Sequence, residues 1–167
     1  VITVGAYTTK TSWIDVDGDT WSTSYLLEDI TPFSSLGPTR DGRLKPDICA
    51  PGSMICSARS ADGDYADYPY MNLDDGVHIA MQGTSMSAPH ITGLVALMLA
   101  REPDLDPEAV KAILASTAVS GDGWVVAPSH TWGHGKADAS AALAALDDGP
   151  TQTLPICGGV EIKPTAT

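Results

Sequence analysis

Residues 83–90 read G-T-S-M-S-A-P-H, and residues 91–98 continue I-T-G-L-V-A-L-M. If residues 85–101 are drawn as a helix, apolar side chains occupy nearly every side of it. A helix that is hydrophobic all round is a buried one. We therefore predict that residues 85–101 form the central helix of a folded domain, with the small and polar residues of 83–90 at its N-terminal end.

Ser85 is the chemically most informative residue of this segment. A serine at a helix start lies among backbone N–H groups without intrahelical partners and at the positive end of the helix dipole. Negative charge that develops beside Ser85 would be stabilised there, which suits the nucleophile of an acyl-transfer reaction, and Gly83 lets a substrate approach the backbone. The ordinary alternative is that Ser85 or Thr84 only caps the helix. The segment is not the Gly-x-Ser-x-Gly elbow of α/β-hydrolases, because Ser87 replaces the second glycine.

Periodicity and turn residues predict the other elements. One further helix is expected behind the Asp106 cap, with Pro107 in its first turn, and another from the Asp138 cap through Leu146. Short strands are expected where apolar residues lie between turn residues. These strands are Val1 to Ala6, Phe33 to Leu36, Ile48 to Ala50 and Met54 to Ala58.

Residues 7–32 interrupt this pattern with polar side chains. We interpret them as a surface excursion that contains a hairpin around Asp17-Gly18, with Trp13 and Trp21 exposed. Three carboxylates stand at alternate positions, as in calcium loops: Asp15, Asp17 and Asp19. The acid at the twelfth position of an EF-hand is missing, so a solvated turn is the simpler interpretation and a structural calcium ion the alternative.

Composition restricts the partners. The 167 residues have a formal net charge of −12, which would repel a phosphate backbone and disfavours nucleic acid. No stretch approaches the roughly 20 apolar residues of a membrane helix. We expect an extracellular or secreted protein. Because the chain has neither an initiator methionine nor a signal-like start, we interpret it as cut from something longer.

The chain has three cysteines, Cys49, Cys56 and Cys157. An odd number without a Cys-x-x-Cys pair argues against a zinc site or a disulfide framework, and no metal-binding residue is assigned. We expect Cys49 and Cys56 to be small buried apolar residues. A disulfide bridge between them across a turn is the alternative.

The segment at residues 83–98 resembles the active-serine segment of the subtilisin-like serine proteases, or subtilases. Three other stretches agree in order and spacing with that family: V-I-T-V-G-A at 1–6, F-S-S-L-G-P-T-R-D-G-R-L-K-P-D-I-C-A-P-G at 33–52 and W-G-H-G-K-A-D-A at 132–139. The resemblance implies an α/β, subtilisin-like three-layer fold with a mostly parallel sheet and helices on both faces. Residues 1–149 would be the C-terminal portion of the peptidase domain, and residues 150–167 a linker or tail.

The same resemblance implies hydrolysis of peptide or protein substrates through an acyl-enzyme, with no cofactor required for the chemistry. Ser85 corresponds to the nucleophile, and its own N–H to one oxyanion donor. Thr84 corresponds to the neighbour that supports the oxyanion hole. Met86 corresponds to the residue after the nucleophile, where oxidation to the sulfoxide would crowd the site.

The family's catalytic aspartate and histidine motifs and its oxyanion asparagine precede the first strand of this chain, so the sequence contains none of them. In subtilisin itself, loss of the nucleophile or of the base lowers kcat about 10⁶-fold. We therefore expect this chain alone to be inactive and its partner to be the N-terminal half of the same domain. The alternatives are an inactive interaction or scaffold module that retains the fold, and a calcium-dependent surface module.

Other candidate side chains are less specific. The histidines are His78, His90, His130 and His134. His90, one turn into the helix, is not expected to face back to Ser85, and His78 is interpreted as an ordinary strand or loop residue. The tyrosines of the loop ahead of Ser85 are candidates to line a peptide groove, although packing within the loop is simpler: Tyr65, Tyr68 and Tyr70.

Overall fold

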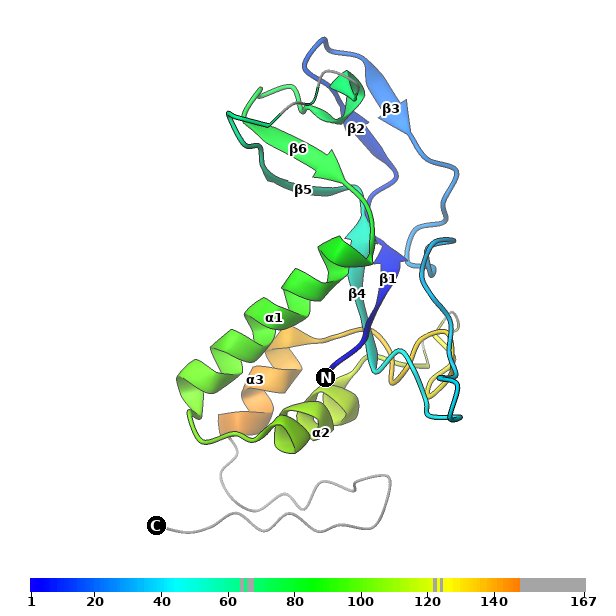
Figure 1. Ribbon diagram of the computed structural model, residues 1–167, viewed down its shortest axis with the longest axis vertical. Coiled ribbons are helices and arrows are strands. Elements are labelled where there is room, and N and C mark those ends of the chain that lie inside the picture. Colours follow the sequence, from blue (N-terminus) through cyan, green and yellow to red (C-terminus); the bar gives the residue numbers. More distant parts are fainter. Residues whose placement is uncertain (64, 66–67, 122, 124, 148–167) are drawn as a thin grey trace.

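The computed structural model describes residues 1–63, 65, 68–121, 123 and 125–147 (Figure 1). The strands are β1 (Val4–Thr8), β2 (Ser12–Ile14), β3 (Thr20–Ser22), β4 (Ile48–Ser53), β5 (Ile55–Ala58) and β6 (His78–Met81). The helices are α1 (Thr84–Arg101), α2 (Pro107–Thr117) and α3 (Ala139–Asp147), with a short 3-10 helix η1 (Pro69–Met71). The predicted tail at 150–167, with Cys157, lies outside the described residues.

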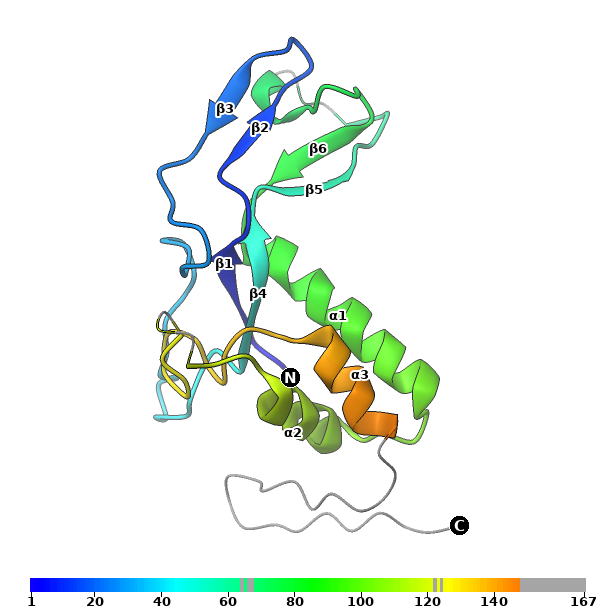
Figure 2. The ribbon, with the colours of Figure 1, turned by 180° about the vertical axis from the view of Figure 1, so that it is seen from behind.

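The strands form three pairs. β1 and β4 are parallel, in a register that runs from Val4 opposite Ile48 to Thr8 opposite Ser53. β2 pairs with β3, and β5 with β6, both antiparallel. Figures 1 and 2 show the two antiparallel ribbons together beyond one end of the parallel pair. Helix α1 begins at that same end and runs past the pair, whereas α2 and α3 lie beside its other end. The parallel pairing expected of the core is therefore present in β1 and β4.

Side chains alternate between the two faces of β4. Ile48 and Ala50 pack with the three helices, whereas Cys49 packs on the other face with Val125 and Trp132. Helices were expected on both faces. In the described residues they cover only the face of Ile48 and Ala50, and non-helical segments cover the other.

The largest apolar cluster lies between the parallel pair and the helices. Its buried members are Ile48, Ala50, Ile91, Leu94, Met98, Val110, Ile113, Leu114 and Ala142. Burial of one large apolar side chain of this kind stabilises the fold by about 1.5–3 kcal/mol. Two other large residues of α1 face solvent, since Leu97 is 56% exposed and Leu99 is 37% exposed. The prediction of a helix buried on every side is therefore wrong for the described part of this chain.

The predicted helix caps are confirmed. The Asp106 carboxylate accepts a hydrogen bond from the Ala109 backbone N–H at 2.7 Å, and α2 begins at Pro107. The Asp138 carboxylate accepts one from the Ala141 backbone N–H at 2.9 Å. Each cap satisfies one of the N–H groups that the first turn leaves without an intrahelical partner.

The predicted hairpin around Asp17-Gly18 is confirmed, with β2 and β3 as its strands. Trp13 was expected to be exposed, and this is wrong. Its ring is only 9% exposed because it packs with Met54 and Ala80, and its Nε1 donates to the Tyr70 carbonyl oxygen at 2.7 Å. Trp21, by contrast, is 41% exposed, as expected.

The strand expected at Phe33 to Leu36 does not form. The Ser34 backbone N–H donates to the Thr31 carbonyl oxygen, which makes this segment a turn beside β1. Its link to β1 runs through a side chain, because the Ala6 N–H donates to Ser34 Oγ at 3.0 Å. The strands predicted at 48–50 and 54–58 do form, as β4 and β5.

The two described cysteines are both free thiols. Cys49 is buried, as expected, and burial raises its pKa to about 12. Cys56 is exposed on β5, where Lys10 Nζ donates to its Sγ at 3.0 Å. The expectation that Cys56 is buried is therefore wrong, and the disulfide alternative is excluded in this structure. Among the described residues, no helix is both long and apolar enough to cross a membrane.

Candidate active site

The start of α1 is joined to the end of β4. The Gly83 N–H donates to the Gly52 carbonyl oxygen at 2.9 Å, which sets the first turn of the helix beside the last residues of the strand. A Cβ on Gly52 would collide with Ser87 Oγ and come within 2.6 Å of Ala6 Cβ. Only glycine therefore lets the strand and the helix approach this closely.

Gly83 is the N-cap residue of α1, with a φ of 145° that favours glycine and no side-chain capping bond. The interpretation of Ser85 or Thr84 as the cap is therefore wrong. Ser85 is the second residue of the helix and is exposed, and Thr84 is half-buried. The first turn carries no acidic side chain, so the partial positive charge of the helix end is not neutralised from within the turn.

A pocket of about 450 Å³ opens beside Ser85. It is lined by Ile55, Cys56, Ser57, Ala58, Tyr65, Ile79, Met81, Ser85, Met86, Pro89 and His90. The β5–β6 ribbon supplies one wall and the first turns of α1 another. Most of the described side chains in this lining are apolar, and among those that the structure describes none is an acid, a lysine or an arginine. The arrangement places an exposed hydroxyl at the edge of a largely apolar recess.

His90 lines this pocket together with Ser85, a proximity that the sequence does not predict. Its Nδ1 lies 2.8 Å from the Met86 carbonyl oxygen. Because a carbonyl only accepts, Nδ1 is the nitrogen that donates and a neutral ring has its acceptor at Nε2. No described hydrogen bond joins His90 to Ser85. The helical spacing of Met86, Pro89 and His90 is the sequence signal that would have placed them on one side of the helix.

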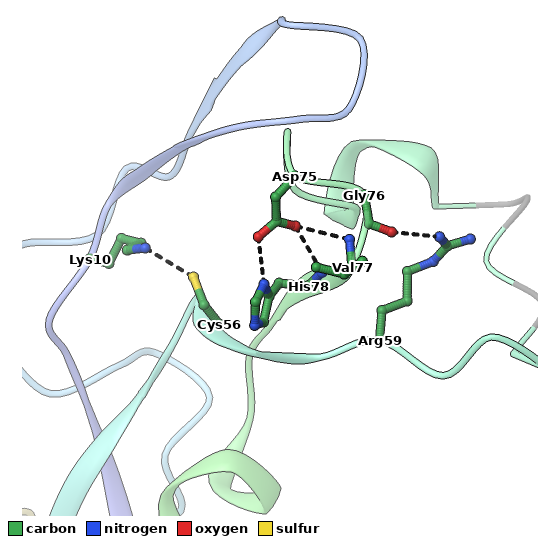
Figure 3. A network of polar contacts seen from close by, with 7 residues as sticks. All are labelled: Lys10, Cys56, Arg59, Asp75, Gly76, Val77 and His78. Carbon is green, nitrogen blue, oxygen red and sulfur yellow. Dashed lines mark hydrogen bonds and ion pairs between the residues drawn. The ribbon is translucent and has the colours of Figure 1, made fainter.

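His78 has a different partner. It begins β6, and its Nδ1 lies 2.5 Å from Asp75 Oδ2 (Figure 3). The Asp75 carboxylate also accepts from the Val77 and His78 backbone N–H groups. The hydrogen bond from His78 is the main reason that the pKa of Asp75 is lowered. This pair closes the turn ahead of β6, so His78 is engaged there and not at Ser85.

In the acidic turn of the β2–β3 hairpin, the Asp15 carboxylate accepts hydrogen bonds from other residues of the hairpin. Asp15 Oδ1 accepts from the Asp17 and Asp19 backbone N–H groups, and Oδ2 accepts from Trp21 Nε1 at 2.7 Å. The bond from Trp21 is the main cause of the lowered pKa of Asp15. Among the residues that the structure describes, no three His, Cys, Asp or Glu side chains are grouped to hold a metal ion. The solvated turn stays the preferred interpretation here, with a structural calcium ion as its untested alternative.

Two of the three loop tyrosines lie together, because the rings of Tyr68 and Tyr70 are arranged edge to face with centroids 6.3 Å apart. Tyr65 lines the pocket with Ser85. Tyr70 packs against Trp21, with ring centroids 5.1 Å apart, and borders the Trp13 cluster. Tyr68 is 53% exposed. The position of Tyr65 therefore agrees with a residue that lines a groove, whereas Tyr70 agrees with a residue that packs within its loop.

Comparison with known proteins decides the family, because a sequence model described as the Subtilase family matches residues 1–148. This chain belongs to the subtilase family. Serine protease AprX of Bacillus subtilis is 35% identical over 143 residues, which cover 86% of this chain and 29% of AprX. Minor extracellular protease Vpr of the same species is 38% identical over 124 residues, which cover 72% of this chain and 14% of Vpr.

Among solved structures, fervidolysin from Fervidobacterium pennivorans, a keratinolytic enzyme related to subtilisin, matches with a TM-score of 0.59 and 32% identity. That match covers 96% of this chain and 20% of fervidolysin. The subtilisin-like α/β fold inferred from the sequence is thereby confirmed. This subtilase chain spans about half the length or less of the relatives it matches.

Proposed function

We propose that this chain is the nucleophile-bearing part of a subtilisin-like serine endopeptidase, with Ser85 as the nucleophile. The observation that carries the proposal is the position of Ser85: an exposed hydroxyl in the first turn of α1, not used as a cap, at the edge of a pocket. Membership of the subtilase family supports the same reaction class.

In the proposed reaction, the general base takes the proton of Ser85 Oγ as this oxygen attacks the carbonyl carbon of a peptide bond. The C–N bond then breaks and the amine leaves with that proton, which gives an acyl-enzyme. Water hydrolyses the acyl-enzyme, releases the acid and restores the Ser85 hydroxyl. The Ser85 backbone N–H, at the positive end of α1, donates to the oxyanion. Thr84 supports this oxyanion site from the preceding position. An N-terminal part of the peptidase domain supplies the general base, its orienting acid and the oxyanion asparagine. This part is the partner we propose for residues 1–149. Residues 150–167 are proposed to be a tail.

A scaffold module that retains the fold without catalysis is the second candidate. It is favoured by the histidines of the site region, because His78 is paired with Asp75 and no described hydrogen bond joins His90 to Ser85. The acidic composition and the extracellular relative Vpr support secretion in either case.

Labelling with a fluorophosphonate serine probe tests the proposal. The complete protein, which contains the N-terminal part, should be labelled and should hydrolyse a peptide, and the isolated chain should do neither. Ser85→Ala should abolish labelling and lower kcat about 10⁶-fold, the loss known for subtilisin. Ser60→Ala, which removes an exposed hydroxyl outside the pocket, serves as the matched control.

Two results would contradict the proposal. Labelling of the complete protein that is unaffected by Ser85→Ala would place the nucleophile elsewhere. A complete, folded protein that is never labelled would favour the scaffold module.

A further inference from the structure

Three aromatic side chains meet on the surface of the antiparallel ribbons, away from the pocket beside Ser85. The ring centroids of Trp21, in β3, and Tyr70, in η1, are 5.1 Å apart, and those of Tyr70 and Tyr68 are 6.3 Å apart. Trp21 and Tyr68 are exposed, and Tyr70 between them is half-buried. We call these three residues the aromatic platform.

Contacts between the β2–β3 hairpin and η1 hold the aromatic platform together from below. Trp13 Nε1 donates to the Tyr70 carbonyl oxygen at 2.7 Å, and the Val16 backbone N–H donates to the Asn72 carbonyl oxygen at 2.9 Å. The rings are therefore arranged before any partner arrives, and a preformed surface loses little conformational freedom on binding.

Exposed carboxylates lie next to the aromatic platform. Asp15 Oδ2 accepts from Trp21 Nε1, and Asp15 Oδ1 accepts from the Asp17 and Asp19 backbone N–H groups. One carboxylate thus holds Asp17 and Asp19 beside the indole of Trp21. Both residues are exposed, and no described hydrogen bond reaches their own carboxylates.

The wider surroundings of the aromatic platform are also acidic. Residues 8–32 and 53–82, which form the two ribbons and their loops, contain ten acidic residues and two basic ones, Lys10 and Arg59. Figure 3 shows both cations engaged elsewhere, Lys10 by the Cys56 sulfur and Arg59 by a backbone carbonyl. In the part of the chain that the structure describes, no lysine or arginine lies over a ring of the platform.

We propose that the aromatic platform, with Asp17 and Asp19, is a docking surface for a basic polypeptide segment that carries arginine or lysine side chains. The hydrogen bond to Asp15 uses the edge of the Trp21 indole, so its face can receive a cation. The cation would then also lie near the Asp17 and Asp19 carboxylates. Arginine suits this surface best, because its planar group stacks on aromatic faces.

Neutral sugars also stack on exposed rings, but the acidic surroundings give them no electrostatic advantage, whereas they attract a basic segment. None of the five residues of the docking surface lines the pocket beside Ser85. The inference therefore does not depend on the role proposed for Ser85.

A binding experiment on the complete protein tests this docking surface. The protein carries Ser85→Ala, so that no peptide is cleaved, and the probe is a fluorescent peptide of alternating arginine and glycine. Fluorescence anisotropy should show that it binds about tenfold or more tightly than the same peptide with glutamine in place of arginine. About 0.5 M salt should weaken binding of the arginine peptide, because exposed charges are screened.

Ring variants test the aromatic part of the surface. Trp21→Ala should weaken binding of the arginine peptide about fivefold, and Tyr68→Ala about twofold. Tyr68→Phe keeps the ring and should bind as before. Leu26→Ala, which removes an exposed apolar side chain outside the aromatic platform, is the matched control and should also have no effect.

Charge variants test the carboxylates. Asp17→Asn combined with Asp19→Asn should weaken binding about threefold to fivefold. The control, Glu102→Gln combined with Asp104→Asn, removes the same charge from exposed residues between α1 and α2 and should leave binding unchanged. These surface changes also test the proposal if Trp21→Ala does not fold.

Four results would overturn the inference. They are equal affinity for the arginine and glutamine peptides, unchanged binding by both Trp21→Ala and Tyr68→Ala, and equal losses in the two charge variants. The fourth is tighter binding of a neutral oligosaccharide, such as chitohexaose, than of the arginine peptide. Failure of the proposed function is a separate outcome, because it leaves the anisotropy measurements unaffected.

Discussion

The molecule has two regions that are stabilised in different ways. The helical region, made of β1, β4 and α1–α3, has a nine-residue apolar cluster drawn from segments far apart in the chain. The ribbon region, made of β2, β3, β5, β6 and their loops, has a cluster of three buried residues and relies on hydrogen bonds to carboxylates and carbonyls. The start of α1 lies where the two regions meet (Figure 2), and its residue Ser85 lines a pocket with residues of β5 and β6. The helical region, with the larger apolar cluster, thus positions the candidate nucleophile, and the ribbon region supplies a wall of the pocket.

The largest effect on stability is expected in the helical region. Met98 is completely buried in its cluster, so Met98→Ala should lower the free energy of unfolding by about 2–5 kcal/mol through lost burial and a cavity. Leu97→Ala, at the neighbouring and 56% exposed position, should change it by less than about 0.5 kcal/mol. Urea denaturation measures both. Equal effects would show that the cluster does not dominate the stability of this region.

A smaller effect is expected at the end of the helical region where β4 meets the start of α1. Gly52→Ala should lower the free energy of unfolding by about 1–3 kcal/mol, because its Cβ overlaps Ser87 and Ala6. Gly93→Ala is the matched control: it lies in α1 with open space around it and should stabilise the protein by about 0.4–1 kcal/mol. Thermal unfolding compares the two. A neutral Gly52→Ala would mean that the close approach of β4 and α1 is not required.

The smallest effect is local to the ribbon region and depends on pH. The pKa of Asp15 is lowered in the folded protein, so its contribution to stability is present above the ordinary carboxyl pKa of about 3.9 and is lost as the pH falls through the lowered value. The Asp17 and Asp19 amides, which donate to Asp15, should then lose protection against hydrogen exchange before the amides of α1 do.

Asp15→Asn should remove most of this pH dependence, because the amide side chain does not titrate. Simultaneous loss of protection in the hairpin and in α1 would contradict the distinction between the two regions.

Local signals in the sequence were sufficient for much of the fold. The Asp106 cap followed by Pro107 determines where α2 starts, since both act within one helical turn. The Asp17-Gly18 turn determines the hairpin in the same way, because Gly18 adopts a φ of 86°. Ser85 was identified from its own segment and from the resemblance that this segment has to the subtilases.

Predictions failed where the outcome depended on a distant partner. Trp13 looked exposed because its neighbours in sequence are polar, but it is buried against Met54 and Ala80 from the other ribbon. Phe33 to Leu36 looked like a strand, but the structure has a turn at Thr31 to Ser34 in place of strand-to-strand hydrogen bonds. Cys56 looked like a buried residue, and its β5 position leaves it exposed beside Lys10.

The sequence by itself determined the three helices with the caps of α2 and α3, the hairpin and the candidate nucleophile, because each depends on residues within a few positions of one another. It also determined the family, through four short stretches in the expected order. Only the tertiary structure decided that Gly83 is the cap, that Gly52 brings β4 against α1, and that Tyr65 and His90 share a pocket with Ser85. The contact of Gly52 with Gly83 joins residues 31 positions apart, and the pocket that Tyr65 shares with Ser85 joins residues 20 positions apart. They exist only after burial of the apolar cluster has brought the strands, the helix and the ribbon together.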